Sequence, residues 1–537
     1  MVRRKNERSM APFRSLKVVA GLEELAKGPI DLSKEGVLSP ERVNAFKSEA
    51  LQMRLLYATE RVTEEVMQAL FSLAREASVI EKMKKMQEGE IVNFIEGVEC
   101  ENRPALHTAV RDFFSEKTSS LVAREASRLA YEEVEKLKKL TEEIGQKRNI
   151  EHIVQIGIGG SQLGPEAVYL ALFGSVKNGK KVHFLSNVDP DDAAAIFNSV
   201  DLRKTLVVSV SKSGTTLETR TNEEFARSYF KKAGIDPKEH LIAVTGRGSP
   251  MDDPSRYLAS FYIWDYIGGR YSVTSMVGGV MLALALGMDC FLDFLRGASA
   301  MDKIALLDDP KKNLPLMAAL LGIWNRNFLK LPTEAVIPYS QALLRFAAHL
   351  QQLDMESNGK QIDKSGRAVD FDTGPIVWGE IGTNGQHSFY QLLHQGTTIV
   401  PLELIGFSQS QRGEDLSYEE TTSQEKLLAN LFAQSIALSV GQRNSNPNKN
   451  FFGNRPNRLL LMKRLDAHSM GSLLSYFEHK VAFQGFIWNI NSFDQEGVQL
   501  GKKLALNILD LFIQKKKKGH FDPQTFPLAQ HYLNQIP

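Results

Sequence analysis

Short apolar runs alternate with helical patterns in two separate parts of this sequence. In the first part the runs are residues 152–157, 181–185, 205–210, 240–244 and 261–264. In the second part they are residues 335–338, 375–378, 398–404 and 459–462. Strands that alternate with helices form parallel sheets with helices on both faces, because each parallel connection needs a crossover. The sequence therefore predicts an α/β fold with two doubly wound, mainly parallel sheets.

The flanking regions have a different pattern. Residues 39–148 have apolar positions spaced three and four apart, with charged residues between them, which is typical of amphipathic helices. We expect five regions along the chain. They are a mostly helical N-terminal region (1–119), a first α/β domain (120–290), a helical connection (291–329), a second α/β domain (330–510) and a C-terminal arm (511–537).

Composition and local patterns exclude several classes of protein. The 65 Lys and Arg residues nearly balance the 63 Asp and Glu residues, which argues against a nucleic-acid partner. The most apolar stretch, 277–288, is too short for a membrane span of roughly twenty residues and predicts a buried helix. Cys100 and Cys290 form neither a disulfide framework nor a CxxC metal motif. Residues 1–16 are basic but precede no apolar segment, so we expect a cytoplasmic protein without a secretory signal.

A hydroxyl-rich turn, residues 210–219 (VSKSGTTLET), joins an apolar run to a helical stretch. It contains Ser211, Lys212, Ser213, Gly214, Thr215 and Thr216. A helix N-cap needs only one hydroxyl. A bound phosphate needs several neutral donors, backbone amides and positive charge. The turn therefore predicts a phosphate site.

Two other glycine-containing turns are less specific. Residues 156–165 (IGIGGSQLGP) join a strand to a helix, but Gln162 stands where a dinucleotide-binding fingerprint has its third glycine. This turn either binds an anion or is simply a tight connection. Arg270 follows Gly268 and Gly269, and either binds an anionic group or forms a structural ion pair.

Two further candidate functional residues lie in the second half of the chain. Glu356 is at the end of a helical stretch closed by Asn358 and Gly359, where the helix dipole disfavours a carboxylate. This placement suits a group that takes up and returns a proton, although a surface glutamate is the alternative. His387 follows a glycine-rich loop and opens a helix, a place where functional side chains are often displayed. His387 and His394 lack a third ligand at a recognised spacing, so we expect no metal.

Together these segments resemble the glucose-6-phosphate isomerase family, also called phosphoglucose isomerase. The most specific segments are residues 265–278, 382–396 (GTNGQHSFYQLLHQG) and 485–502. The resemblance implies two sugar-isomerase (SIS) domains in a homodimer that needs no cofactor. It also implies the reversible conversion of glucose 6-phosphate to fructose 6-phosphate through an enediol, in glycolysis and gluconeogenesis.

The resemblance implies a role for each candidate residue. Glu356 would carry the proton between C2 and C1, and Arg270 would stabilise the enediolate. His387, supplied by the other subunit, and Lys502 would help to open the sugar ring. The substrate-binding residues would be Gly160, Ser161, Ser211, Lys212, Ser213, Gly214, Thr215, Thr216, Gln352 and Gln495. Of these, Ser211, Lys212, Ser213 and Thr216 would hold the phosphate.

Two alternatives remain open from the sequence. A non-catalytic protein that senses a sugar phosphate would need the hydroxyl-rich turn but not Glu356, His387 and Lys502. An isomerase of mannose 6-phosphate would use the same residues, alone or as an additional activity. The chain also departs from the family pattern at Ser213 and Gly214, where a different substrate affinity is an open alternative, and at Glu496, to which the resemblance assigns no effect.

Overall fold

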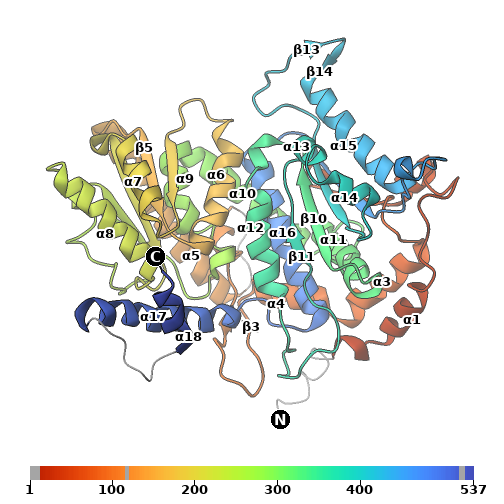
Figure 1. Cartoon of the computed structure of the whole chain (residues 1–537), viewed down its shortest axis with the longest axis horizontal. Coiled ribbons are helices and arrows are strands. Elements are labelled where there is room, and N and C mark those ends of the chain that lie inside the picture. Colours follow the sequence, from red (N-terminus) through yellow and green to blue (C-terminus); the bar gives the residue numbers. More distant parts are fainter. Residues whose placement is uncertain (1–11, 115–119, 519–526, 537) are drawn as a thin grey trace. The chain divides into compact units, whose positions relative to one another are not determined.

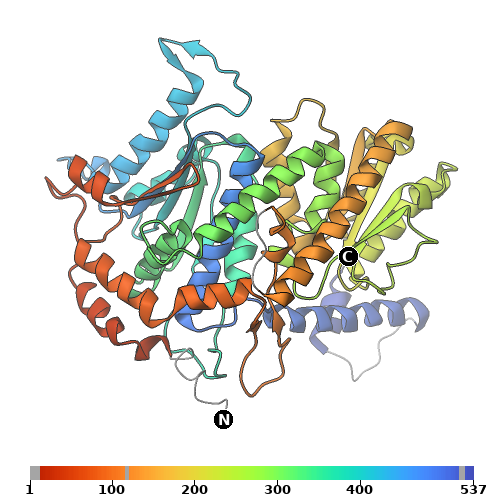
Figure 2. The same ribbon diagram turned by 180° about the vertical axis from the view of Figure 1, so that it is seen from behind.

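A computed structural model describes residues 12–114, 120–518 and 527–536 of the chain. The chain divides into two compact units, Met1–Phe493 and Asp494–Pro537, and each is described by itself. Residues 1–11 of the basic N-terminal stretch and residues 519–526 of the expected arm lie outside the described residues. The first unit contains two mainly parallel sheets, which confirms the predicted fold class (Figures 1 and 2). The predicted domain bounds remain predictions.

The first sheet has five strands, and all neighbouring strands run parallel. In spatial order they are β6 (Lys181–Leu185), β5 (His152–Ile156), β7 (Thr205–Ser211), β8 (Leu241–Thr245) and β9 (Ala259–Tyr262). Each of the five apolar runs in the first series overlaps one of these strands. In the three central strands, β5, β7 and β8, burial on both faces explains why the runs are apolar without alternation.

Helices cover both faces of this sheet. Successive side chains of a strand point to opposite faces, so Val207 packs in one core cluster with Phe197 and Phe230. Its neighbour Val208 belongs to the large core cluster that includes Val280. The helices that supply these partners are α7 (Pro190–Ser199), α8 (Leu217–Lys232) and α9 (Met276–Leu286).

The second sheet has six strands. In spatial order they are β1 (Lys47–Ala50), β2 (Met53–Leu56), β15 (Asn457–Met462), β12 (Leu402–Phe407), β10 (Thr333–Pro338) and β11 (Ile376–Trp378). The last four run parallel to one another, whereas β1 and β2 add an antiparallel hairpin at one edge. The helical reading of residues 39–148 is wrong for this hairpin, because strands of four residues are too short to show a clear alternation.

Helices also cover both faces of the second sheet. Ile337 shares a core cluster with Tyr390 and Leu438, whereas Val336 belongs to the cluster that includes Leu320 and Phe477. The helices on the first face are α14 (Tyr390–Gln395) and α15 (Ser423–Val440). Those on the other face include α11 (Leu314–Ile323), α12 (Phe346–Gln351) and α16 (Ala467–Trp488).

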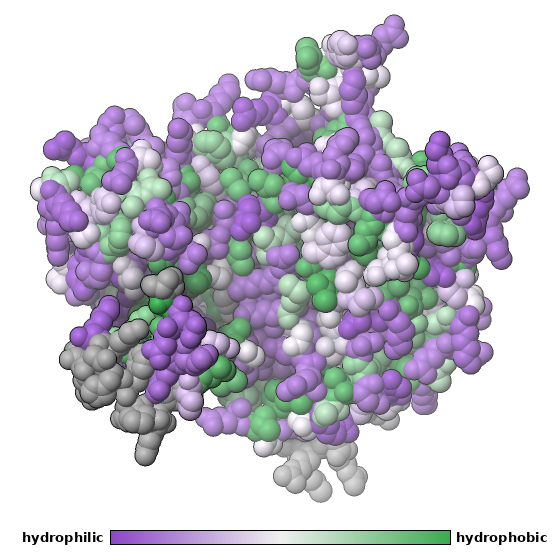
Figure 3. All heavy atoms as spheres, viewed as in Figure 1, coloured by the Kyte–Doolittle hydropathy of each residue, from purple (hydrophilic) through white to green (hydrophobic). Residues whose placement is uncertain are grey.

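Several helices of the first unit are buried all round. Every residue of α9 and of α11 is buried, as a helix without a polar face requires. The segment Gly269–Leu286 has the length and hydropathy of a membrane span, but 94% of it is buried inside the protein. Its helical part, α9, is the buried helix that the sequence predicts at residues 277–288, although α9 ends at Leu286. Hydrophobic side chains are only scattered over the mostly hydrophilic face shown in Figure 3.

Two groups of buried charged residues tie distant segments together. The Nη2 atom of Arg111 lies 2.7 Å from Oδ1 of Asp302 and 2.8 Å from Oε2 of Glu478. In a second group, Nη1 of Arg458 lies 3.1 Å from Oε1 of Glu60. Both arginine side chains are completely buried, and each is compensated by more than one carboxylate.

The remaining helices of the first unit are α1 (Lys17–Leu25), α2 (Pro40–Ala45), α3 (Glu64–Glu76), α4 (Val79–Gln87), α5 (Leu121–Lys147), α6 (Leu163–Phe173), α10 (Met288–Ile304) and α13 (Gly382–Gln386). Two small hairpins pair β3 (Ile91–Asn93) with β4 (Arg103–Pro104) and β13 (Ser417–Tyr418) with β14 (Thr421–Thr422). The second hairpin and α15 project from the first unit (Figures 1 and 2). The second unit contains α17 (Gln499–Lys518) and α18 (Pro527–Asn534).

Candidate active site

The hydroxyl-rich turn joins the end of β7 to the start of α8, which is where parallel sheets usually bind ligands. The Ser211 and Thr216 hydroxyl oxygens lie 2.9 Å apart, and the Ser213 hydroxyl accepts hydrogen bonds from the Thr215 backbone and side chain. Gly214 has a φ of +66°, which a residue with a side chain rarely adopts. Among the described residues, Thr216 is the N-cap of α8 but its side chain makes no capping bond. The hydroxyls therefore remain as a cluster rather than serving as an ordinary cap.

Lys212 connects this turn to the segment that precedes Arg270. Its Nζ donates to the carbonyl oxygen of Ile267 at 3.1 Å, and the Asp265 carbonyl oxygen lies at 3.5 Å. Burial lowers the pKa of Lys212. The ammonium group therefore sits in a largely desolvated position beside the hydroxyl cluster.

The glycine turn after β5 meets the Arg270 segment at very close range. A β-carbon added to Gly160 would lie 2.1 Å from the carbonyl oxygen of Gly269, so the contact requires glycine. A β-carbon on Gly159 would lie 3.3 Å from Nε2 of Gln352. Within the described part of the chain, the buried Oε1 atom of Gln352 has no hydrogen-bond partner. Three chain segments therefore meet here: the glycine turn, which includes Ser161 in its 3-10 segment, the Arg270 segment and the segment that contains Gln352. The turn is thus not simply a tight connection.

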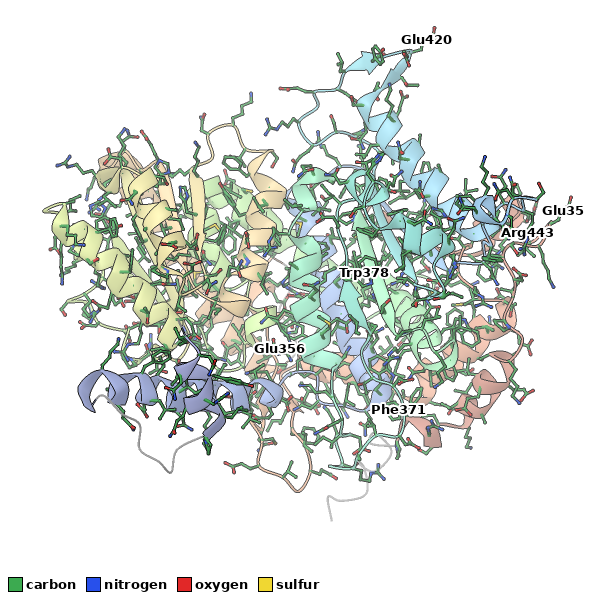
Figure 4. All side chains as sticks on the ribbon, viewed as in Figure 1. Glu35, Glu356, Phe371, Trp378, Glu420 and Arg443 are labelled. Atoms are coloured by element: carbon green, nitrogen blue, oxygen red, sulfur yellow. The ribbon has the colours of Figure 1, made fainter. Side chains whose placement is uncertain are left out.

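Glu356 ends a π-helical segment, Gln352–Glu356, that continues directly from α12. Short π-helical segments are often found at functional sites. The helix stops after Asn358, and the Gly359 amide donates to the Met355 carbonyl at 2.9 Å, so the predicted helix end is confirmed. The Glu356 side chain is 22% exposed, while the Arg270 side chain beside it is completely buried. Figure 4 shows Glu356 near the end of α12.

Arg270 is surrounded by partners that the sequence did not reveal. Its Nη1 lies 3.4 Å from Oε2 of Glu356. Its Nε donates to Oγ of Ser357 at 2.6 Å, and its Nη2 donates to the carbonyl oxygen of Ser492 at 2.6 Å. Ser357 directly follows Glu356 and Ser492 lies in the segment 485–502, but nothing in either pattern indicates an arginine partner.

His387 lies apart from these residues within one chain. It follows α13 and precedes α14, so the expectation that it opens a helix is wrong; the glycine-rich loop itself forms α13. Its side chain is exposed. In the same view, α13 lies toward the opposite end of α12 from Glu356 (Figures 1 and 4).

Two of the predicted site residues belong to the second unit. Gln495 precedes a 3-10 turn, Glu496–Val498, and Lys502 lies in the first turns of α17. Their predicted roles therefore remain predictions. The first unit brings together Gly160, Arg270, Gln352 and Glu356, with Lys212 linking the hydroxyl-rich turn to them.

Comparison with known proteins covers nearly the whole chain. The phosphoglucose isomerase family model matches residues 56–529. A glucose-6-phosphate isomerase from Protochlamydia amoebophila is 56% identical over 516 residues, which cover 96% of this chain and 95% of that protein. One from Chlamydia pneumoniae is 54% identical over 512 residues, covering 95% of this chain and 96% of that protein.

A solved structure agrees with these sequence matches. The crystal structure of a glucose-6-phosphate isomerase from Chlamydia trachomatis matches with a TM-score of 0.93 and 48% sequence identity. The match covers 98% of this chain and 99% of that chain. The family model extends over the first sheet, the four parallel strands of the second sheet and every candidate site residue. The chain therefore belongs to the phosphoglucose isomerase family.

Proposed function

We propose that the protein is a cytoplasmic enzyme that interconverts glucose 6-phosphate and fructose 6-phosphate. The observation that carries the proposal is the position of Glu356. Its partly exposed carboxylate lies beside the buried Arg270 guanidinium, at the junction where Gly159, Gly160 and Gln352 meet. The names of the relatives support the same substrates.

Glu356 is the proposed proton carrier. It takes the proton from C2 of the open-chain aldose, and the electron pair forms the C1–C2 double bond of an enediolate. Return of that proton to C1, while the hydroxyl proton moves from O2 to O1, gives the ketose. A positioned base contributes roughly 10²–10⁴ to such a rate, and the fixed positive charge of Arg270 favours the charge that develops on oxygen.

The hydroxyl-rich turn is the proposed phosphate anchor. Ser211, Ser213 and Thr216 offer hydroxyl donors, and the N-terminus of α8 offers backbone amides and a favourable dipole. Lys212 supplies positive charge from a half-buried position. Binding energy from the unreactive phosphate then orients the sugar for proton transfer.

An exposed apolar stripe on α15 supports the proposal of a homodimer. Its members share one face at helical spacing: Ala429, Phe432, Ala433, Ile436, Ala437 and Val440. Phe432, Ile436 and Val440 are 38%, 56% and 40% exposed. The opposite face of α15 already packs on the second sheet through Leu431 and Leu438. A helix that is apolar on both faces needs a second partner.

The stripe lies beside the segment that carries His387. Gln386, the residue before His387, donates from its side chain to Asn430 of α15 at 3.1 Å. His394 of α14 pairs with Gln434 of α15 at 2.8 Å. A second copy docked on α15 would therefore be close to His387, so we propose that each active site uses His387 of the partner subunit.

Conversion of fructose 6-phosphate in deuterium oxide tests the proposed reaction. We expect glucose 6-phosphate that carries deuterium at C2, because the proton on Glu356 exchanges with solvent in part of the turnovers. Fructose without the phosphate should react far more slowly, because it lacks the anchor. Binding of the sugar phosphates without conversion would instead identify a sensor, and conversion of mannose 6-phosphate would reveal the additional activity.

A mixing experiment tests the shared site. Glu356→Gln and His387→Gln homodimers should both be nearly inactive. Random exchange of subunits should restore about a quarter of wild-type activity, because half the dimers are mixed and each has one intact site. Failure to regain activity, despite demonstrated subunit exchange, would show that Glu356 and His387 of one chain act together.

A further inference from the structure

Different groups contact all three nitrogen atoms of the Arg270 guanidinium. Nε and Nη2 make short contacts of 2.6 Å with the Ser357 hydroxyl and the Ser492 carbonyl oxygen. The contact between Nη1 and Glu356 is longer, at 3.4 Å. Because the guanidinium is planar and rigid, fixing two nitrogens also fixes the direction of the third. The two short contacts, more than the carboxylate, therefore determine where the positive charge lies.

We propose that Ser357 is a positioning residue whose hydroxyl holds the Arg270 guanidinium beside the Glu356 carboxylate. The proposal rests on the catalytic roles proposed above for Glu356 and Arg270. Ser357 is completely buried and directly follows Glu356 in the chain. One short piece of backbone thus brings both the carboxylate and the hydroxyl to the same guanidinium. A shift of this helix end would move both contacts together.

Tyr271 orients the Ser357 hydroxyl from the other side. The two hydroxyl oxygens lie 3.0 Å apart, and either can be the donor. The Tyr271 ring is buried and stacks on His107 with ring centroids 4.6 Å apart. Burial raises the pKa of Tyr271 to about 12, so the phenol stays protonated at neutral pH. The Ser357 hydroxyl is thereby held in place between Tyr271 and Arg270.

The second short contact is connected to the same helix end. The Ser492 hydroxyl donates to the side-chain oxygen of Asn358 at 2.8 Å, and the Asn358 amide group donates to the Val481 carbonyl at 3.1 Å. Glu356, Ser357 and Asn358 are consecutive, and each is connected to the surroundings of Arg270. Such a set of mutual contacts preorganises a charge before substrate arrives.

The Ser357→Ala variant tests the proposal. We expect kcat to fall about tenfold to a hundredfold, because a displacement on the ångström scale is sufficient for such a loss. We expect KM to stay within about twofold, because the contact orients a charge and does not bind the substrate. Ser475→Ala is the matched control, because Ser475 is also completely buried and accepts from Nη2 of Arg111 at 3.0 Å. It should lose stability but keep its kcat.

Tyr271→Phe separates positioning from general destabilisation. It keeps the aromatic ring but removes the hydroxyl, and we expect kcat to fall about twofold to fivefold. In the Ser357→Ala background the same change should have no further effect on kcat, because Tyr271 acts through Ser357. A folded Ser357→Ala protein with unchanged kcat, or additive effects of the two changes, would overturn the proposal. If Glu356→Gln itself keeps its turnover, the proposed function fails first, so the two failures are distinguishable.

Discussion

Gly160 and Gly269 pack so closely that a β-carbon on Gly160 would lie 2.1 Å from the Gly269 carbonyl oxygen. Both contacting atoms would belong to short, constrained turns, so neither can move without shifting its segment. We therefore expect Gly160→Ala to separate the glycine turn from the Arg270 segment. Turnover should fall by at least about a hundredfold, since misplacement on the ångström scale has effects of this size.

Gly145 provides the matched control for Gly160. It lies in α5, and an added β-carbon would meet no described atom within 4 Å. Gly145→Ala should keep full activity and gain up to about 1 kcal/mol in unfolding free energy, because alanine favours a helix. Steady-state assays and urea unfolding of both variants make the comparison. Equal activity of the two variants would mean that the close contact is unimportant for the site.

The apolar stripe on α15 predicts that Ile436→Asp weakens the dimer. Ile436 is 56% exposed, and a charge there would oppose docking of a second copy by desolvation. Sedimentation at a series of concentrations should show a higher dissociation constant and a parallel loss of activity. Val188→Asp is the control, because Val188 is 47% exposed in the connection between β6 and α7. A stable, active Ile436→Asp dimer would contradict the assignment of this face.

Asp354 predicts an unusual dependence of stability on pH. It is buried within the π-helical segment, and burial raises its pKa to about 7, opposed by Lys480 and increased by Glu334. The folded protein therefore binds more protons than the unfolded chain between about pH 4 and 7, so this group lowers stability as pH rises. The unfolding free energy of Asp354→Asn should match that of wild type near pH 4 and should exceed it at pH 8 by up to about 4 kcal/mol.

Chemical denaturation across this pH range measures the difference. Asp253 provides a comparison of opposite sign, because hydrogen bonds from Ser255 lower its pKa at an exposed position. The Asp253 carboxylate therefore contributes stability at neutral pH that is lost on acidification. If Asp354→Asn were no more stable than wild type at pH 8, the prediction would be contradicted. The folded protein would then have to stabilise the ionised Asp354 carboxylate.

The elements predicted most accurately from the sequence are the buried strands. The run at residues 205–210 falls within β7, every residue of which is buried, because a strand covered on both faces is mostly apolar. β1 and β2 were missed, since a half-exposed edge hairpin resembles a short amphipathic helix at that length. Parts of the candidate site could also be predicted from local sequence. The hydroxyl-rich turn and the end of the helix at Glu356 are local features, and both appeared in the sequence.

Contacts between distant segments could not be predicted. The Gly160–Gly269 contact and the hydrogen bond from Arg270 to Ser357 join residues more than eighty positions apart in the chain. No spacing in the sequence records such a pair. The π-helical character of the segment before Glu356 was equally hidden, because it depends on how the helix end packs and not on residue type.

The buried Arg111–Asp302 pair predicts a large loss of stability when one partner is removed. Arg111→Met would leave Asp302 and Glu478 buried without their cation, at a cost of about 3–5 kcal/mol. Arg128→Met is the control, because Arg128 pairs with Glu125 at 2.7 Å on the exposed face of α5, where solvent screens the pair and its contribution to stability is small. Urea unfolding measures the unfolding free energy of both variants. Equal losses would contradict the claim that burial makes the Arg111 ion pairs important for stability.

Turnover of fructose 6-phosphate by Glu356→Gln tests the central claim most directly. Glutamine keeps the shape of the side chain but cannot carry the proton. We expect a folded dimer whose kcat falls by about 10²–10⁴, with deuterium incorporation from solvent reduced in parallel. Glu143→Gln, an exposed change in α5, should leave the rate unchanged. A Glu356→Gln enzyme within about tenfold of wild type would contradict the assignment of Glu356 as the proton carrier.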